Sequence, residues 1–346
     1  MPGVGGKGGQ PDRLRRRWQD RLGDHVIALA WSPTGTRLAA AQVSGPVRVY
    51  DARTGAVMLR LPGHDLGTTD LGFSHDGAHV ATCGQDGKVK FWDLKTGQEK
   101  NAVTGGDTWV EHLAWSPTEI LLASAAGKRL RLWDAEGRPI RDYSDHTSTI
   151  SDVQWRSKTR MISTTSYGSL TLWDVDRNDP AQRFEWKGSI LVHAWSPNGQ
   201  FVATGDQDAT VHFWFATTGQ DLQMWGYRTK VRELSWDATS RYLATGGGLV
   251  ITIWDCGGQG PEGTTPLQLE GHEDSLTAVA FQHAGPLLAS AGTDGCVAVW
   301  QPPKSIRPVA FVQLDSEATQ IAWSPDDNLL AVGTDAGDVG VLALPA

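Results

Sequence analysis

Histidine, serine and aspartate side chains occur in this sequence in combinations that could support nucleophilic or acid–base chemistry. His146 and the pair Ser151-Asp152 supply the residue types of a hydrolytic triad, but their spacing identifies no triad without geometry. No Gly-rich phosphate loop, GxSxG elbow, HExxH motif or paired-cysteine motif accompanies them. We therefore predict that the protein is not an enzyme and that it has no catalytic residues.

Metal binding is the other chemistry that these side chains suggest. His25, His112 and His193 lie in or just before separate strand-like segments, so the sequence leaves open that they converge on one ion. The three cysteines lie far apart and form no CxxC pair, which predicts buried free thiols rather than a disulfide framework or a zinc motif. We predict no cofactor and no metal.

A repeated segment must position these side chains. Its fullest copy, Leu269–Gln301, contains Gly271-His272, an alternating run that ends at Phe281, a turn at Thr293-Asp294-Gly295 and a second run that ends at Trp300. In eight copies an aromatic residue ends the first run: Trp31, Phe73, Trp115, Trp155, Trp195, Trp236, Phe281 and Trp323. The residues that end the third strand recur every 40 to 46 residues: Tyr50, Trp92, Trp133, Trp173, Trp214, Trp254, Trp300 and Leu342.

The period and the in-phase Trp-Asp motifs, as in Phe91-Trp92-Asp93, carry a family resemblance. From about Leu14 to Leu342 the chain resembles the WD-repeat (tryptophan–aspartate repeat) β-propeller family. The WSP turns that begin at Trp31 and Trp115 look more like a bacterial member than a eukaryotic one. The resemblance implies an interaction platform rather than any particular partner.

The physical pattern supports the same fold. Alternating apolar residues make half-buried strands, and a four-stranded blade cannot cover both of its faces alone. Blades that stack radially bury a continuous core, and closing the ring leaves only short sheet edges. We predict an all-β closed propeller of four-stranded blades, with eight blades favoured and seven as the alternative.

The N-terminal region divides into two parts. Residues 1–13 are expected to form a flexible tail, because Met1–Gln10 contains five glycines. Residues 14–346 are expected to form a single WD-repeat domain. Leu14–Leu22 is predicted to supply the outer strand that the last blade lacks and so to close the ring, with a basic arm for nucleic acid or membrane as the alternative reading.

The resemblance also implies a buried hydrogen-bond network in each complete blade. It joins the Gly-His histidine, a Ser or Thr of the second strand, the Asp of the next turn and the Trp of the third strand. Two repeats match residue by residue: His64, Thr82, Asp86 and Trp92, and His272, Ser290, Asp294 and Trp300. A third repeat is partial, with Trp186 in the histidine position before Thr204, Asp208 and Trp214.

Partner binding is expected on the narrow face made by the loops before the first strands and by the turns between the second and third strands. Of sixteen tryptophans, Trp109 alone has no structural position, so it is a candidate anchor. Packing of Trp109 over the channel mouth is equally open. The other candidates on this face are charged or aromatic: Glu111, Tyr167, Lys230, Arg232, Glu317 and His25.

Composition and these candidates together define the expected function. A net charge of −8 argues against nucleic acid or an anionic membrane as partner. No segment has the form of a secretory signal, and we expect a cytoplasmic protein that is monomeric by itself. The mixed aromatic and charged face suits a protein or peptide partner with apolar and acidic groups. The prediction is a non-enzymatic scaffold, with a metal- or small-ligand-binding propeller that uses the channel mouth as the alternative.

Overall fold

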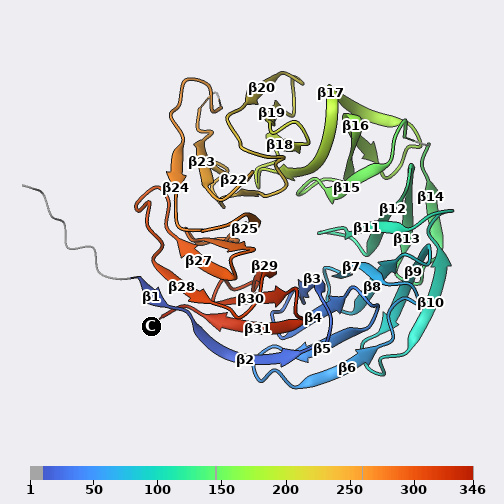
Figure 1. Ribbon diagram of the computed structural model, residues 1–346. Coiled ribbons are helices and arrows are strands. Elements are labelled where there is room, and N and C mark those ends of the chain that lie inside the picture. The colour runs from blue at the N-terminus through green and yellow to red at the C-terminus, as the bar shows by residue number, and fades with distance from the viewer. Residues whose placement is uncertain (1–10, 145, 259, 346) are drawn as a thin grey trace, which may run out of the picture.

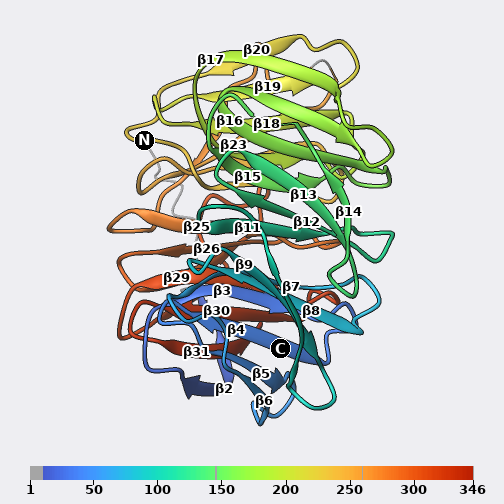
Figure 2. The ribbon, with the colours of Figure 1, turned by 90° about the vertical axis from the view of Figure 1, so that its right-hand side faces the viewer.

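Strands are arranged in a ring in a computed structural model that describes residues 11–144, 146–258 and 260–345 (Figure 1). All regular elements in these ranges are β-strands, so no helix able to cross a membrane is found there. Viewed from the side, the strands of each repeat lie against those of the next repeat (Figure 2). The expected all-β propeller fold is confirmed.

Eight repeats of strands follow one another along the chain. Repeat one comprises β3 (Val26–Trp31), β4 (Arg37–Gln42), β5 (Val47–Asp51) and β6 (Val57–Leu61), and repeat two β7 (Thr68–Phe73), β8 (His79–Gly84), β9 (Lys88–Asp93) and β10 (Glu99–Thr104). Repeat three comprises β11 (Val110–Trp115), β12 (Leu121–Ala126), β13 (Arg129–Asp134) and β14 (Pro139–Asp142), and repeat four β15 (Ile150–Trp155), β16 (Met161–Asp174) and the first part of β17 (Pro180–Trp195).

The second half of the chain continues the series. Repeat five takes the rest of β17 with β18 (Phe201–Asp206), β19 (Val211–Phe215) and β20 (Asp221–Met224), and repeat six β21 (Leu234–Trp236), β22 (Tyr242–Thr245), β23 (Ile251–Asp255) and β24 (Leu267–Leu269). Repeat seven comprises β25 (Leu276–Phe281), β26 (Leu288–Gly292), β27 (Cys296–Trp300) and β28 (Ala310–Gln313), and repeat eight β29 (Ala318–Trp323), β30 (Leu329–Thr334) and β31 (Asp338–Ala343).

These strands form seven hydrogen-bonded sheets, so the favoured count of eight separate blades is corrected. The difference arises where repeats four and five meet. There Tyr167 of β16 pairs with Ser189 of β17, which joins the two repeats into one six-stranded sheet, β15 to β20. The repeat pattern does not predict this junction, because the junction depends on a backbone pairing rather than on side-chain types.

The N-terminal segment lies on the outside of the last repeats. Strand β2 (Arg15–Arg21) pairs antiparallel with β31, along which it runs in Figure 1. Strand β1 (Asp12–Arg13) pairs in parallel with β28, although the expected tail 1–13 includes these residues. Residues 1–10 of that expected tail lie outside the described residues.

Tryptophan indoles at the ends of the first strands connect neighbouring repeats. The Trp31 indole N–H donates to the carbonyl of Ala322 at 2.9 Å, so the first repeat is hydrogen-bonded to the last. The Trp115 indole donates to Gly72 at 3.0 Å in the same way. This explains why an aromatic residue with a donor recurs at this position: the ring fills space between sheets and its N–H finds a backbone acceptor.

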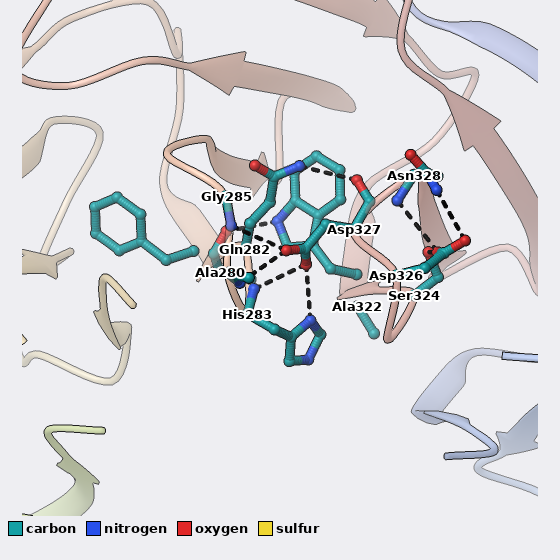
Figure 3. A network of polar contacts seen from close by, with 12 residues as sticks. Ala280, Gln282, His283, Gly285, Ala322, Ser324, Asp326, Asp327 and Asn328 are labelled. Atoms are coloured by element: carbon teal, nitrogen blue, oxygen red, sulfur yellow. Dashed lines mark hydrogen bonds and ion pairs between the residues drawn. The ribbon is translucent and has the colours of Figure 1, made fainter. Parts of the chain in front are cut away.

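The turn that follows β29 adds a polar contact to repeat seven (Figure 3). The carboxylate of Asp327 accepts hydrogen bonds from the backbone N–H groups of His283, Ala284 and Gly285, at 2.8 to 3.0 Å. The Nδ1 atom of His283 lies 2.9 Å from the same carboxylate. Burial would raise the pKa of Asp327, but these hydrogen bonds hold that pKa below its ordinary value.

Candidate functional site: a cavity on the rim

The histidine networks in repeats two and seven are structural centres. The ring nitrogens of His272 lie 2.8 Å from Ser290 Oγ and 3.1 Å from Asp294 Oδ2, and the Trp300 indole donates to the same Ser290 oxygen at 2.8 Å. His272 and Trp300 are buried, so a substrate could hardly reach this network.

Repeat two has the same geometry. His64 lies 2.7 Å from Asp86 Oδ1 and 2.9 Å from Thr82 Oγ1, and the Trp92 indole donates to Thr82 at 2.9 Å. Burial lowers the pKa of His64, although the hydrogen bond to Asp86 opposes that shift. A buried neutral imidazole with both nitrogens engaged stabilises the fold and has no free nitrogen for catalysis.

A triad-like arrangement does occur, but with other residues than His146 and Ser151. Ser163 Oγ lies 2.7 Å from His193 Nε2, and His193 Nδ1 lies 2.9 Å from Asp152 Oδ2. Ser163 and His193 are both 0% exposed, and the Trp195 indole also donates to Ser163 Oγ. Since substrate cannot reach the serine, these residues link repeats four and five rather than catalyse a reaction.

The expected rim residues divide into two groups. Trp109, Glu111, Tyr167 and Arg232 line one cavity of about 480 Å³, to which repeats two to six contribute. The remaining lining residues are mostly small and polar: Thr69, Gln85, His112, Ser148, Thr149, Ile150, Ser151, Ser189, Ile190 and Leu191. We call this space the rim cavity. Lys230, Glu317 and His25 do not line it.

Two exposed aromatic side chains characterise the rim cavity. Trp109 lies in the loop directly before β11 and is 50% exposed, and Tyr167 of β16 is 59% exposed. Half of the Trp109 surface is therefore accessible to solvent. Exposed aromatic surface next to a cavity is characteristic of binding sites, because rings contribute much contact area with few rotatable bonds.

The charged groups of the rim cavity have opposite signs and are not paired with each other. Within the described ranges, the carboxylate of Glu111 and the guanidinium of Arg232 form neither a side-chain hydrogen bond nor an ion pair. His112, next to Glu111 on β11, lies near two further carboxylates, those of Asp70 and Asp152. Both charges on the cavity wall are thus available to a ligand.

Burial and charge set the ionisation of the two carboxylates near His112. Burial raises the pKa of Asp70 to about 6, and the negative charge of Asp152 contributes to that increase. Burial also acts to raise the pKa of Asp152, but the charge and hydrogen bonds of His193 hold it below its ordinary value. At neutral pH both groups are therefore predominantly negative.

The described residues contain no cluster of three or more His, Cys, Asp or Glu side chains that could hold a metal ion. His193 is buried and lies against Ser163, whereas His112 lines the rim cavity. Among the described residues, His25, His112 and His193 form no such cluster. The possible convergence of His25, His112 and His193 thus finds no support in the geometry.

A second aromatic surface was missed by the sequence reasoning. Trp225 follows β20 directly and is 73% exposed, more than Trp109, although the sequence analysis left only Trp109 without a structural position. It lines a separate cavity of about 480 Å³ together with Met224, Trp254, Pro261 and Pro266. The signal that could have found it is the Gly/Pro-rich insertion at 256–266, since Pro261, Glu262, Gly263, Thr264 and Pro266 of this segment line that cavity.

Comparison with known proteins supports the repeat architecture. The family model "WD domain, G-beta repeat" matches residues 55–93, 97–134, 137–174, 181–214 and 263–301, together more than half of the chain. A computationally designed protein, Ika8, superimposes with a TM-score of 0.81 at 24% identity, covering 97% of this chain and 100% of that one. That likeness concerns the fold alone.

Curated relatives are longer proteins with varied names. Telomerase protein component 1 of Rattus norvegicus is 26% identical over 276 residues, which are 77% of this chain and 10% of that protein. Nuclear distribution protein PAC1 of Arthroderma benhamiae is 26% identical over 320 residues, 87% of this chain and 64% of that protein. Cell division cycle 20.5, cofactor of APC complex, of Arabidopsis thaliana is 22% identical over 310 residues, 83% of this chain and 67% of that protein. These relatives are eukaryotic and give no support to a bacterial origin.

Proposed function

Because the chain belongs to the WD-repeat family, we propose that it is a non-enzymatic scaffold whose rim cavity binds a protein or peptide partner. The observation that carries this proposal is that Trp109, Glu111, Tyr167 and Arg232, from repeats three, four and six, line one cavity. Exposed aromatics, one arginine and unpaired charges are the side chains that dominate binding energy at protein interfaces.

The relatives support the same class of function. One is named as a cofactor of the APC complex and another as a transcriptional corepressor. These names describe proteins that act with other proteins, and the family comprises scaffolds and regulators more than enzymes. A cytoplasmic location and a monomeric state are parts of the proposal that fractionation and sedimentation would test.

The test is a quantitative affinity capture from cell lysate. The double variant Trp109→Ala/Arg232→Glu changes two residues of the rim cavity that are exposed, so the fold is expected to persist. The matched control, Lys230→Ala/Glu317→Gln, changes two exposed residues that do not line the cavity.

The expected result is a protein enriched by the wild type and the control but lost with the double variant. Equal capture by all three proteins would show that the rim cavity is not the binding site. Capture of no protein, together with a stoichiometric metal or small molecule in the purified sample, would favour a ligand-binding propeller instead.

We also propose that β2 closes the ring by joining the last repeat to the first. On one edge it pairs with β31. On the other side the Trp18 indole donates to the carbonyl of Ala52 at 2.8 Å, and Asp20 Oδ2 accepts from Tyr50 and Arg48 at 3.0 and 2.7 Å.

Deleting residues 1–22 tests this closure against deletion of residues 1–10. The longer deletion should lower the free energy of unfolding by about 3–5 kcal/mol, from the lost burial of Trp18 alone, or prevent folding. The shorter deletion should have little effect, and urea denaturation measures both. Equal urea midpoints for the two deletions would contradict the closure.

A further inference from the structure

We propose that Trp109, Tyr167 and Glu111 form a subsite for one cationic side chain, lysine or arginine, of the bound partner. This inference rests on the proposed function, because the subsite is part of the rim cavity. It names the chemistry that the cavity recognises, which the family comparison does not.

The aromatic part of the subsite comes from two neighbouring repeats. Trp109 precedes the first strand of repeat three and Tyr167 lies in repeat four, and both line the rim cavity together with Glu111. Both rings are at least half exposed, so their faces are accessible to a ligand. The face of an indole or phenol ring is electron-rich and attracts an ammonium or guanidinium group.

The local charge selects a cation over an anion. Glu111 is half-buried and its carboxylate has no partner in the part of the chain that the structure describes. The unpaired carboxylate of Glu111 makes this side of the rim cavity negative, which an anionic ligand would oppose.

An uncharged side chain fits the same place less well. An apolar group in contact with the Glu111 carboxylate would remove its water without replacing the hydrogen bonds, which costs free energy. A lysine or arginine satisfies that carboxylate directly and contacts the rings with its aliphatic stem. The cationic occupant is therefore favoured by both the rings and the acid.

Arg232 determines the orientation in which a partner segment lies in the rim cavity. It precedes the first strand of repeat six, and Figure 1 places repeats three and six on different sides of the channel. A partner segment that crosses the cavity thus places its basic residue against repeats three and four. An acidic group of the same segment then faces Arg232.

The subsite can be tested without knowing the partner, by titrating the protein with capped amino acids. The probes are the N-acetyl amides of arginine, lysine, glutamate and leucine. The readout is the indole N–H signal of Trp109 in nuclear magnetic resonance spectra, assigned by its loss in Trp109→Phe. The variant Glu111→Gln removes the charge but keeps the shape, and Glu317→Gln makes the same change at an exposed rim residue of repeat eight that does not line the cavity.

We expect the arginine and lysine probes to shift the Trp109 signal in a saturable way and the glutamate and leucine probes not to. The dissociation constant of the arginine probe should rise about fivefold or more in Glu111→Gln and stay unchanged in Glu317→Gln. Equal shifts with leucine, or no effect of Glu111→Gln, would overturn the cationic subsite. If affinity capture still depends on Trp109 and Arg232 in that case, the scaffold function stands and only the subsite fails.

Discussion

Repeats seven and five occupy equivalent positions in the ring but use their polar residues differently. In repeat seven His272 contacts Ser290 and Asp294, and Trp300 shares the same serine oxygen. In repeat five Trp186 takes the place of the histidine. The indole nitrogens of Trp186 and Trp214 then have no hydrogen-bond partner among the described residues.

The missing histidine changes its neighbours as well. The ring of Trp186 lies against His212, with 3.8 Å between ring centroids, and the turn residue Asp208 contacts Thr210 instead of a histidine. Burial raises the pKa of Asp206 to about 7, with a contribution from the charge of Asp208. Repeat five is therefore held together by packing of aromatic rings. Among the described residues, its buried polar groups lack the hydrogen-bond partners that the equivalent groups have in repeat seven.

The comparison shows which part of the repeat is indispensable. Strand alternation and the aromatic residues that end the strands are present in both repeats, and both are folded. The polar network adds stability and fixes the loop before the first strand, but a repeat can form without it. Variants that break the network in one repeat, or complete it in the other, measure this difference.

The largest effect is expected from Asp294→Ala. This change removes the carboxylate that contacts His272 and accepts from the backbone N–H groups of Glu273 and Cys296. The free energy of unfolding should fall by about 1–3 kcal/mol, because a buried imidazole nitrogen loses its partner. Urea denaturation measures the loss.

The matched change in repeat five is Asp208→Ala, where the exposed carboxylate contacts only a threonine hydroxyl. Its effect should stay below about 0.5 kcal/mol. Similar losses for the two variants would remove the distinction between the repeats.

The second effect concerns pH and Asp206. Its folded pKa, about 7, lies above the ordinary value of 3.8, so the folded state binds more protons than the unfolded state between these values. Stability from this group is therefore present at low pH and is lost as the pH rises toward 7.

Asp206→Asn should remove that loss. The free energy of unfolding of the variant, relative to the wild type, should therefore increase by about 2 kcal/mol as the pH rises from 5 to 8. Urea denaturation at several pH values gives the difference. Asp179→Asn, which changes an exposed carboxylate, serves as the control and should follow the wild type. A constant difference between Asp206→Asn and wild type across this range would show that Asp206 is ionised normally.

The smallest effect is expected from completing the network in repeat five. Trp186→His should be more stable than Trp186→Phe by about 1 kcal/mol, because an imidazole can contact Thr204 and Asp208 as His272 contacts its partners. Adding Thr204→Val to both variants should abolish the difference. If the histidine variant is no more stable than the phenylalanine variant, the position no longer supports the network.

Much of the architecture was predictable from the sequence, because one repeat pattern determines it many times over. The strand pattern, the pairing of Leu14–Leu22 with the last repeat and the spacing of His272 and Asp294 all follow from that pattern. The sheet count was not predictable, since it depends on one backbone pairing, Tyr167 with Ser189, to which no side-chain pattern corresponds.

The candidate site was predictable in part. Phase in the repeat placed Trp109, Glu111, Tyr167 and Arg232 on one face, and they line one cavity. Repeat phase could not show that Lys230, Glu317 and His25 lie outside this cavity, because the extent of a cavity depends on how the loops fold. The exposure of Trp225 was missed for a similar reason, since the position of the 256–266 insertion is not encoded in strand alternation.

The most direct test of partner binding at the rim cavity is a hydrogen–deuterium exchange footprint of the protein with its captured partner. The rim cavity predicts slower exchange at residues 108–112, 166–168, 188–191 and 229–233. The equivalent loops of repeats seven and eight, residues 273–277 and 315–319, should exchange as in the free protein. Protection confined to those two loops, or to the surface around Trp225, would contradict the assignment of the binding site to the rim cavity.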